Sequence, residues 1–310
     1  MLDMKKVKTL GTSHCLVMTS DLSVLGRVSN QKTFIYINQE WKSPIILDTP
    51  KNPSQLRFAQ NNSRVIIQNT SGSIYIYETN HFDLLKKIQS NKHCKLIEDG
   101  FVCLNERNVL LCIAKVNSSE QIVAFDLELG TCHPITNFNH SQIYYNQYVE
   151  KEKAHLFTLC FHNQTTDFVE YSILKLKEPD YSIEIISPSE NLVWNAVFLD
   201  PYTGTYVLID GNEVILLSSD LTRVIKRMRL PLPSINGLHQ YYNKAILSND
   251  GKFLVIAYSD CVAILDSQQL EIRTIKNLPY ACFVEFSKCD QFLLIGTWEK
   301  GYILENNLIE

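Results

Sequence analysis

Short apolar runs alternate with polar, turn-forming clusters along the whole chain. The runs are roughly five to eight residues long and rich in Val, Ile, Tyr and Phe, a composition typical of β-strands. Clear examples are 64–68, 73–77, 253–257 and 291–295. No stretch of about twelve residues repeats apolar side chains at i, i+3, i+4 and i+7 between capping residues, so the pattern predicts almost no helix. Parallel α/β folds need crossover helices and are therefore excluded.

The strand-like runs recur in groups. A strand, a polar turn and a second strand occur together at 56–67, 245–256 and 284–295. A third strand follows each group and ends in an apolar residue and then usually a polar or acidic one. These closing positions are 40, 48 and 39 residues apart from Asn38 to Glu78, from Glu78 to Asp126 and from Asp266 to Glu305. A period of roughly 40–48 residues is typical of one four-stranded propeller blade.

A second sequence feature recurs with a similar period. An aromatic residue opens the expected innermost strand of four successive groups at spacings of 49, 48 and 38 residues, namely Tyr145, Trp194, Tyr242 and Tyr280. The two repeating patterns, closing residues and opening aromatic residues, together predict an all-β fold. We expect a single seven-bladed β-propeller of four-stranded antiparallel blades that occupies residues 1–310 as one domain. The expected blades lie near 12–50, 54–90, 93–137, 142–187, 191–231, 238–277 and 280–310.

The last expected blade is one strand short, because the chain stops soon after the strand that ends at Leu304. The segment 5–10 alternates apolar and polar residues and fits no strand of the first blade. We therefore expect this N-terminal strand to complete the last blade and close the ring, which would leave no open sheet edge between the first and last blades.

The repeated groups resemble the blades of WD-repeat β-propellers. The resemblance is carried by 56–67, 245–256 and 284–295, and 125–130 is similar to the third strand and following turn of that family. The chain has no Gly-His dipeptide and no Trp-Asp dipeptide, so it resembles a diverged member. Only 11 of the 310 residues are glycine, and we expect Asn to take the positive-φ turn positions that glycine usually fills.

Charge and hydropathy exclude some classes of partner. With 29 basic and 33 acidic side chains the formal charge is −4, which argues against a nucleic-acid binder. The strongest basic run, 223–230, falls on an expected outer strand, where charge normally prevents edge-to-edge aggregation. No apolar run reaches about 18 residues, so no membrane insertion is expected.

Cysteine usage indicates a reducing compartment. The nine cysteines include no CxxC pair, and most lie inside apolar runs, where a thiol behaves as a small hydrophobe. The N-terminal sequence shows no signal-peptide pattern. We therefore expect a cytoplasmic protein.

A search for catalytic motifs finds none. The chain has no GxSxG, HExxH, P-loop or GxGxxG sequence, so no catalytic residue, metal or cofactor is predicted. Cys160 and His162 could share one face of a strand, but without a second ligand pair we interpret them as a buried thiol beside a solvated histidine. The alternative function is a lactonase-like hydrolase at the channel mouth, for which the candidate groups are Glu150, Asp200, Glu285 and His239.

The favoured interpretation is a non-enzymatic module that binds a protein or peptide on its loop-bearing face. The chain would act as a monomeric ring or as a subunit of a hetero-complex. Exposed aromatic side chains supply large contact area and dominate binding hot spots. The expected partner-binding residues are Trp298, Tyr258, Tyr242, Trp194, Tyr145, Tyr280 and Lys300.

Overall fold

The computed structural model confirms the predicted fold. It contains 59% strand and 1% helix, in seven four-stranded antiparallel blades arranged in a ring, which is a seven-bladed β-propeller. The structure describes residues 4–29, 31–39, 41–59, 61–90, 94–98, 102–104, 108–116, 119–129, 131–139, 141–163, 168–233 and 240–307. None of these residues belongs to a helix long and apolar enough to cross a membrane.

The chain divides into two compact units. One consists of Thr9–Ser141 and Glu299–Gly301, and the other of Met1–Lys8, Gln142–Trp298 and Tyr302–Glu310. We call them the first and second units. The strands of each blade are named A to D in sheet order. Strand A begins at the end of the blade that carries the B–C turn, and the A–B and C–D turns lie at the other end.

The first unit holds blades 1 to 3. Blade 1 consists of β2 (Cys15–Met18), β3 (Val24–Val28), β4 (Thr33–Ile37) and β5 (Ile45–Leu47). Blade 2 consists of β6 (Pro53–Phe58), β7 (Arg64–Asn69), β8 (Ile74–Glu78) and β9 (Leu84–Ile88). Blade 3 consists of β10 (Lys95–Leu96), β11 (Val102–Leu104), β12 (Val109–Val116), β13 (Ser119–Asp126) and β14 (Cys132–Pro134). Its strand A is divided, because β10 and β11 both pair with β12.

The second unit holds blades 4 to 7. Blade 4 consists of β15 (Ser141–Val149), the 3₁₀ helix η1 (Glu150–Glu152), β16 (Ala154–Asn163), β17 (Phe168–Lys177) and β18 (Ser182–Ile186). Blade 5 consists of β19 (Ala196–Leu199), β20 (Tyr206–Asp210), β21 (Glu213–Leu217) and β22 (Val224–Arg229). Blade 6 consists of β23 (Tyr242–Leu247), β24 (Phe253–Tyr258), β25 (Cys261–Asp266) and β26 (Glu271–Asn277).

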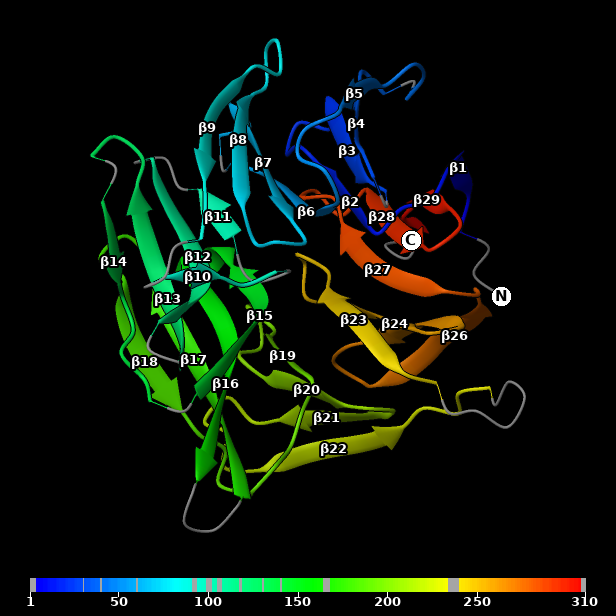
Figure 1. Ribbon diagram of the computed structural model, residues 1–310. Coiled ribbons are helices and arrows are strands. Elements are labelled where there is room, and N and C mark those ends of the chain that lie inside the picture. Colours follow the sequence, from blue (N-terminus) through cyan, green and yellow to red (C-terminus); the bar gives the residue numbers. More distant parts are fainter. Residues whose placement is uncertain are drawn as a thin grey trace. The chain divides into compact units, whose positions relative to one another are not determined.

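Blade 7 takes its fourth strand from the N-terminus, as predicted. Its strands A to D are β27 (Ala281–Phe286), β28 (Phe292–Thr297), β29 (Gly301–Glu305) and β1 (Lys6–Leu10). Blue β1 lies beside red β29 in Figure 1. The Glu305 N–H donates to the Lys5 carbonyl at 2.9 Å, and the Lys5 ammonium lies 3.0 Å from the Glu305 carboxylate. The spare strand therefore pairs with the sheet edge that the C-terminal strand leaves open.

The burial pattern explains why many strands appear in the sequence as continuous apolar runs. Strand β24 is buried at every position because consecutive blades cover both of its faces, and one apolar cluster joins Phe198 of blade 5 to Leu254 of blade 6. A second cluster in the same unit joins Val255 to Val284 of blade 7. The outer strand β22 is mostly exposed and therefore tolerates its basic side chains.

The repeated turn motif has a direct structural reason. In blades 1, 6 and 7 a hydroxyl directly after strand A accepts the N–H of the first residue of strand B. Thr19 accepts from Val24 at 3.0 Å, and Ser248 and Ser287 accept from Phe253 and Phe292 at 2.9 Å each. These bonds satisfy backbone donors that the turn would otherwise leave unpaired.

Among the described residues, each A–B turn contains one with positive φ. Asparagine fills the position in two blades, as expected for a glycine-poor chain, and other residue types fill the rest. The seven residues are Leu22, Asn62, Asn108, Lys153, Gly204, Gly251 and Asp290.

Candidate partner-binding surface

Two of the predicted anchor residues have buried side chains. Trp194 is 2% exposed, and its indole N–H donates to the Thr158 hydroxyl at 2.9 Å. Tyr258 is fully buried, and its hydroxyl donates to the Gly211 carbonyl at 2.9 Å. Both rings thus fill space between consecutive blades of the second unit, and in this conformation neither is open to a partner.

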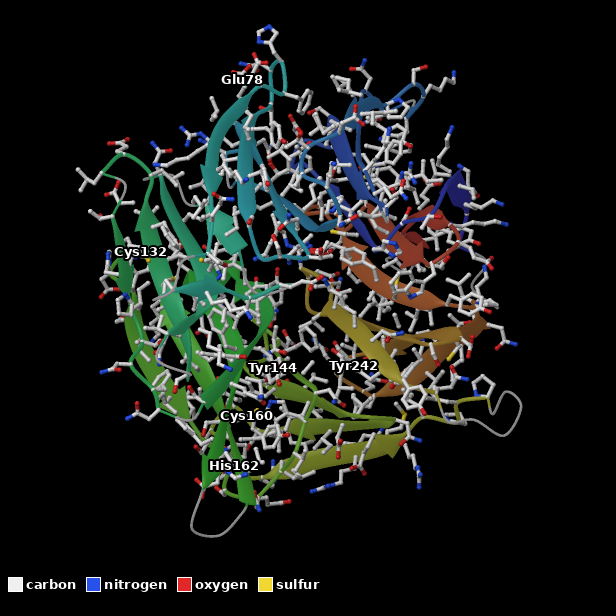
Figure 2. All side chains as sticks on the ribbon, viewed as in Figure 1. Glu78, Cys132, Tyr144, Cys160, His162 and Tyr242 are labelled. Carbon is white, nitrogen blue, oxygen red and sulfur yellow. The ribbon has the colours of Figure 1, made fainter. Side chains whose placement is uncertain are left out.

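Three more predicted residues differ in exposure. Tyr145 is half-buried and packs edge-on against Phe157, with ring centroids 5.5 Å apart. Tyr242 at the start of β23, labelled in Figure 2, is half-buried against the core of blades 5 and 6, and burial raises the pKa of its hydroxyl. Lys300 is exposed and belongs to the first unit.

Tyr280 and Trp298 are the two predicted aromatic residues that are well exposed, at 54% and 58%. The structure brings them together at the B–C end of blade 7, where the Trp298 N–H donates to the Tyr280 carbonyl at 3.1 Å. A β-bulge between Ala281 and Phe283 follows at once. Bulges re-aim side chains at the ends of sheets, and here one stands directly after the exposed Tyr280.

Tyr241, which the sequence analysis did not select, is 67% exposed. Its carbonyl accepts the Ser259 N–H at 3.0 Å, and a bulge between Tyr242 and Lys244 follows it. Tyr241 is therefore the structural equivalent of Tyr280, whereas the sequence register had equated Tyr242 with Tyr280. An offset of one residue moves a side chain to the other face of a strand. Because two tyrosines stand together at 241 and 242, this doublet is the sequence signal that could have indicated an exposed ring.

Blades 6 and 7 place the strand starts that carry these residues next to each other. Strands β23 and β27, yellow and orange in Figure 1, lie side by side. The Asn243 amide donates to the Ala281 carbonyl at 2.7 Å and so joins the starts of the two strands. We call Tyr241, Tyr280 and Trp298 the aromatic surface.

Blade 2 has the same backbone arrangement with different side chains. The Thr70 N–H donates to the Asn52 carbonyl at 3.0 Å, and a bulge between Pro53 and Gln55 follows. The φ angle is 51° at Asn52 and 60° at Tyr280. Asn52 and Thr70 are both exposed and correspond to Tyr280 and Trp298 of blade 7.

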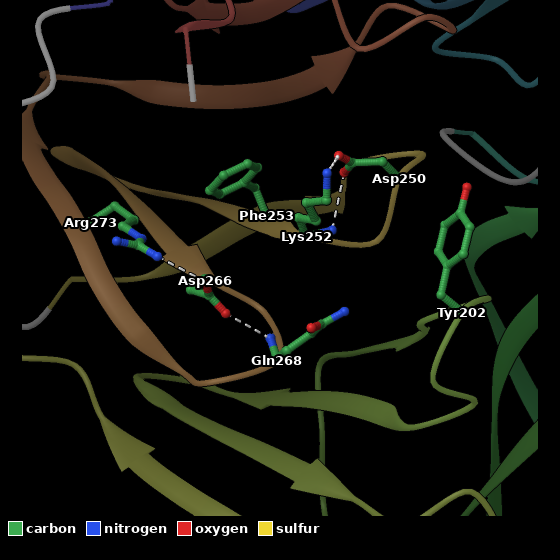
Figure 3. Close-up of a pocket in the computed structure, with 7 residues that line it drawn as sticks. All are labelled: Tyr202, Asp250, Lys252, Phe253, Asp266, Gln268 and Arg273. Atoms are coloured by element: carbon green, nitrogen blue, oxygen red, sulfur yellow. Dashed lines mark hydrogen bonds and ion pairs between the residues drawn. The ribbon is translucent and has the colours of Figure 1, made fainter. Parts of the chain in front are cut away.

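An open pocket of about 510 Å³ lies at the opposite, A–B end of the second unit. Its lining consists of Tyr202, Asp250, Lys252, Phe253, Asp266, Gln268 and Arg273. Two ion pairs visible in Figure 3 join its charged groups, Asp250 to Lys252 at 3.2 Å and Asp266 to Arg273 at 3.0 Å. Burial opposes ionisation of Asp250, but bonds from Ser248 and Lys252 hold its pKa below the usual value, so at neutral pH the group is an ionised hydrogen-bond acceptor and a weak base.

The described candidates for a hydrolase site lie on separate elements with partners of their own. Asp200 is 1% exposed, and its carboxylate accepts the Tyr202 N–H at 2.8 Å and the Thr203 hydroxyl at 2.6 Å within one turn. Glu150 belongs to η1, and Glu285 lies on β27 at 3.8 Å from the Lys244 ammonium. His239 lies outside the described residues. The Asp200 carboxylate stabilises its own turn.

Cys160 and His162 lie toward the end of β16 (Figure 2). Cys160 is 5% exposed and hydrogen-bonds to Tyr171, whereas His162 is exposed. This difference in burial agrees with a structural thiol beside a solvated histidine.

A scan of models of known protein families finds none that matches the chain, and a search of curated proteins finds no relative. The fold and the geometry of the exposed surfaces therefore carry the functional argument.

Proposed function

We propose that the protein is a non-enzymatic interaction module that binds a protein or peptide through the aromatic surface. It would work as one propeller domain, WD-repeat-like in character, either as a monomer or within a hetero-complex. All nine cysteines are free, which suits the reducing cytoplasm that we propose as its location.

The observation that carries the proposal is the backbone conformation of Tyr280. A non-glycine residue in the left-handed region costs roughly 1–2 kcal/mol, and Asn and Asp reduce this cost by local hydrogen bonds. Blade 2 uses Asn52 at the equivalent position, so the backbone does not require an aromatic ring there. A strained, half-exposed tyrosine beside an exposed tryptophan is the arrangement expected when the side chains are kept for contact with a partner.

Matched variants test the proposal. The tagged full-length protein, Tyr241→Ala, Trp298→Ala and Tyr202→Ala would each be used for affinity capture from the native cell, followed by mass spectrometry. Tyr202 is a suitable control because it is 67% exposed, as Tyr241 is, but lies at the A–B end beside the pocket. We expect proteins that wild type and Tyr202→Ala retain to be lost with the other two variants.

Thermal unfolding separates binding from folding in this experiment. Trp298→Ala should change the free energy of unfolding by less than about 1 kcal/mol, because most of the side chain is in solvent. If Tyr202→Ala lost the captured proteins and Trp298→Ala retained them, the binding site would lie at the A–B end and the proposal would be refuted. Unfolding of Trp298→Ala would show that the residue belongs to the core.

A further inference from the structure

Asp260 lies between the two tyrosines of the aromatic surface. The N–H of the preceding residue, Ser259, donates to the Tyr241 carbonyl at 3.0 Å. The Asp260 carbonyl accepts the Leu278 N–H at 2.9 Å, two residues before Tyr280. Two backbone hydrogen bonds therefore fix the backbone of Asp260 between the segments that carry Tyr241 and Tyr280.

Among the residues that the structure describes, the Asp260 carboxylate has no ion-pair partner. Within the described ranges its side chain takes part in no hydrogen bond or ion pair, although it is half-buried. The nearby Cys261 thiol has its pKa raised to about 11 by burial and by the negative charge of Asp260. Asp210 at the end of β20 is an exposed carboxylate, and it precedes Gly211, the acceptor of the buried Tyr258 hydroxyl.

The basic side chains of this region do not neutralise Asp260. The Lys244 ammonium lies 3.8 Å from Glu285 and 4.1 Å from the centre of the Phe283 ring, so it is already engaged. Lys276 is exposed on β26 and forms no ion pair with Asp260 in the described structure. The surface thus combines exposed aromatic rings with negative charge.

We propose, building on the function proposed above, that the partner segment is basic and that one of its arginines lies on the aromatic surface facing Asp260. Aromatic faces attract cations, and a carboxylate at their edge adds a charge-assisted hydrogen bond. The planar guanidinium of arginine can stack on a ring and donate to a carboxylate at the same time, which a lysine ammonium cannot do as well.

Short peptides test this assignment on the full-length protein. One acetylated peptide alternates Arg with Gly and Ser, a second replaces each Arg with neutral citrulline, and a third replaces each Arg with Glu. Trp298 is 58% exposed while Trp41 and Trp194 are 4% and 2% exposed, so acrylamide quenching of tryptophan fluorescence reports mainly on the surface. We expect only the Arg peptide to protect the fluorescence and to bind in calorimetry, with an affinity that falls as salt rises.

Carboxylate variants complete the test. Asp260→Asn should weaken binding of the Arg peptide by about threefold or more. Glu271→Gln, which removes an exposed carboxylate on β26, is the control and should bind as wild type does. Equal binding of the citrulline peptide, no binding of the Arg peptide, or an unchanged affinity in Asp260→Asn would each overturn the assignment. None of these results would contradict the proposed function, which is tested separately by whether Tyr241→Ala and Trp298→Ala lose the captured proteins.

Discussion

Blades 2 and 7 share one backbone arrangement at the start of strand A, which we call the corner, but carry different side chains there. In both, a residue with positive φ precedes strand A, its carbonyl accepts the N–H of the residue after strand B, and a bulge follows. Blade 2 places Asn52 and Thr70 there, and blade 7 places Tyr280 and Trp298. The corner itself therefore depends on the backbone, and the side chains are free to differ.

The difference between the two blades distinguishes side chains that stabilise a turn from side chains that are exposed to solvent. In blade 2 the Asn69 carboxamide oxygen accepts the N–H groups of Ser71 and Ser73 at 3.2 and 2.9 Å and so stabilises the B–C turn. In blade 7 Thr297 stands at the position of Asn69, and the residue after it, Trp298, is exposed. A polar side chain can stabilise such a turn, so the aromatic pair of blade 7 requires an explanation outside the fold.

The largest effect is expected from a buried aromatic residue of the neighbouring blade. Tyr258→Ala should destabilise the protein by about 3–5 kcal/mol, because it opens a cavity and leaves the Gly211 carbonyl without its donor. Denaturant unfolding followed by circular dichroism measures this loss. Tyr258→Phe, which keeps the ring, should lose only about 1 kcal/mol. A Tyr258→Ala protein as stable as wild type would mean that this ring is available for binding, as the sequence analysis expected.

Much of the fold could be predicted from the sequence because it repeats. Three similar strand–turn–strand groups, together with closing and aromatic residues at regular spacing, predicted the blade period, and the spare alternating segment 5–10 predicted the strand that completes blade 7. The positive-φ turn residues were only partly predictable. Asn62 and Asn108 follow the expectation, but Leu22 and Lys153 occupy the same position without any intrinsic preference for it.

The surface was harder to predict than the fold. Of the aromatic residues at strand starts, Trp194 faces a neighbouring blade and Tyr280 faces solvent, and sequence spacing does not distinguish these two cases. A bulge shifts the register by one residue, which is why Tyr242 was selected and Tyr241 was missed. Asp260 became a candidate only when backbone hydrogen bonds linked its loop to Tyr241 and to Leu278, two residues before Tyr280.

An intermediate effect is expected from giving blade 7 the side chains of blade 2. The double variant Tyr280→Asn with Trp298→Thr should change the free energy of unfolding by less than about 1 kcal/mol, since Asn relieves strain while some burial is lost. Partner affinity should fall at least about tenfold, as expected for loss of hot-spot aromatics. Calorimetric titration with the captured partner measures the affinity.

The control for this exchange is a pair of substitutions in blade 2 itself. Asn52→Ala with Thr70→Ala changes the equivalent exposed positions and should leave partner affinity as it is in wild type. If both double variants lost affinity equally, the two corners would be functionally alike and the contrast between them would have no meaning for binding.

The smallest effect is expected from the reverse change, which measures the cost of the tyrosine directly. Asn52→Tyr should destabilise the protein by about 1 kcal/mol, because the new side chain must adopt a φ near the 51° of Asn52. Asn52→Gly should stay within about 0.5 kcal/mol of wild type, because glycine adopts this conformation without strain. Thermal unfolding of the three proteins at one pH gives the comparison. If Asn52→Tyr were as stable as wild type, a tyrosine at this corner would cost nothing, and the conformation of Tyr280 would no longer indicate that its ring is kept for a partner.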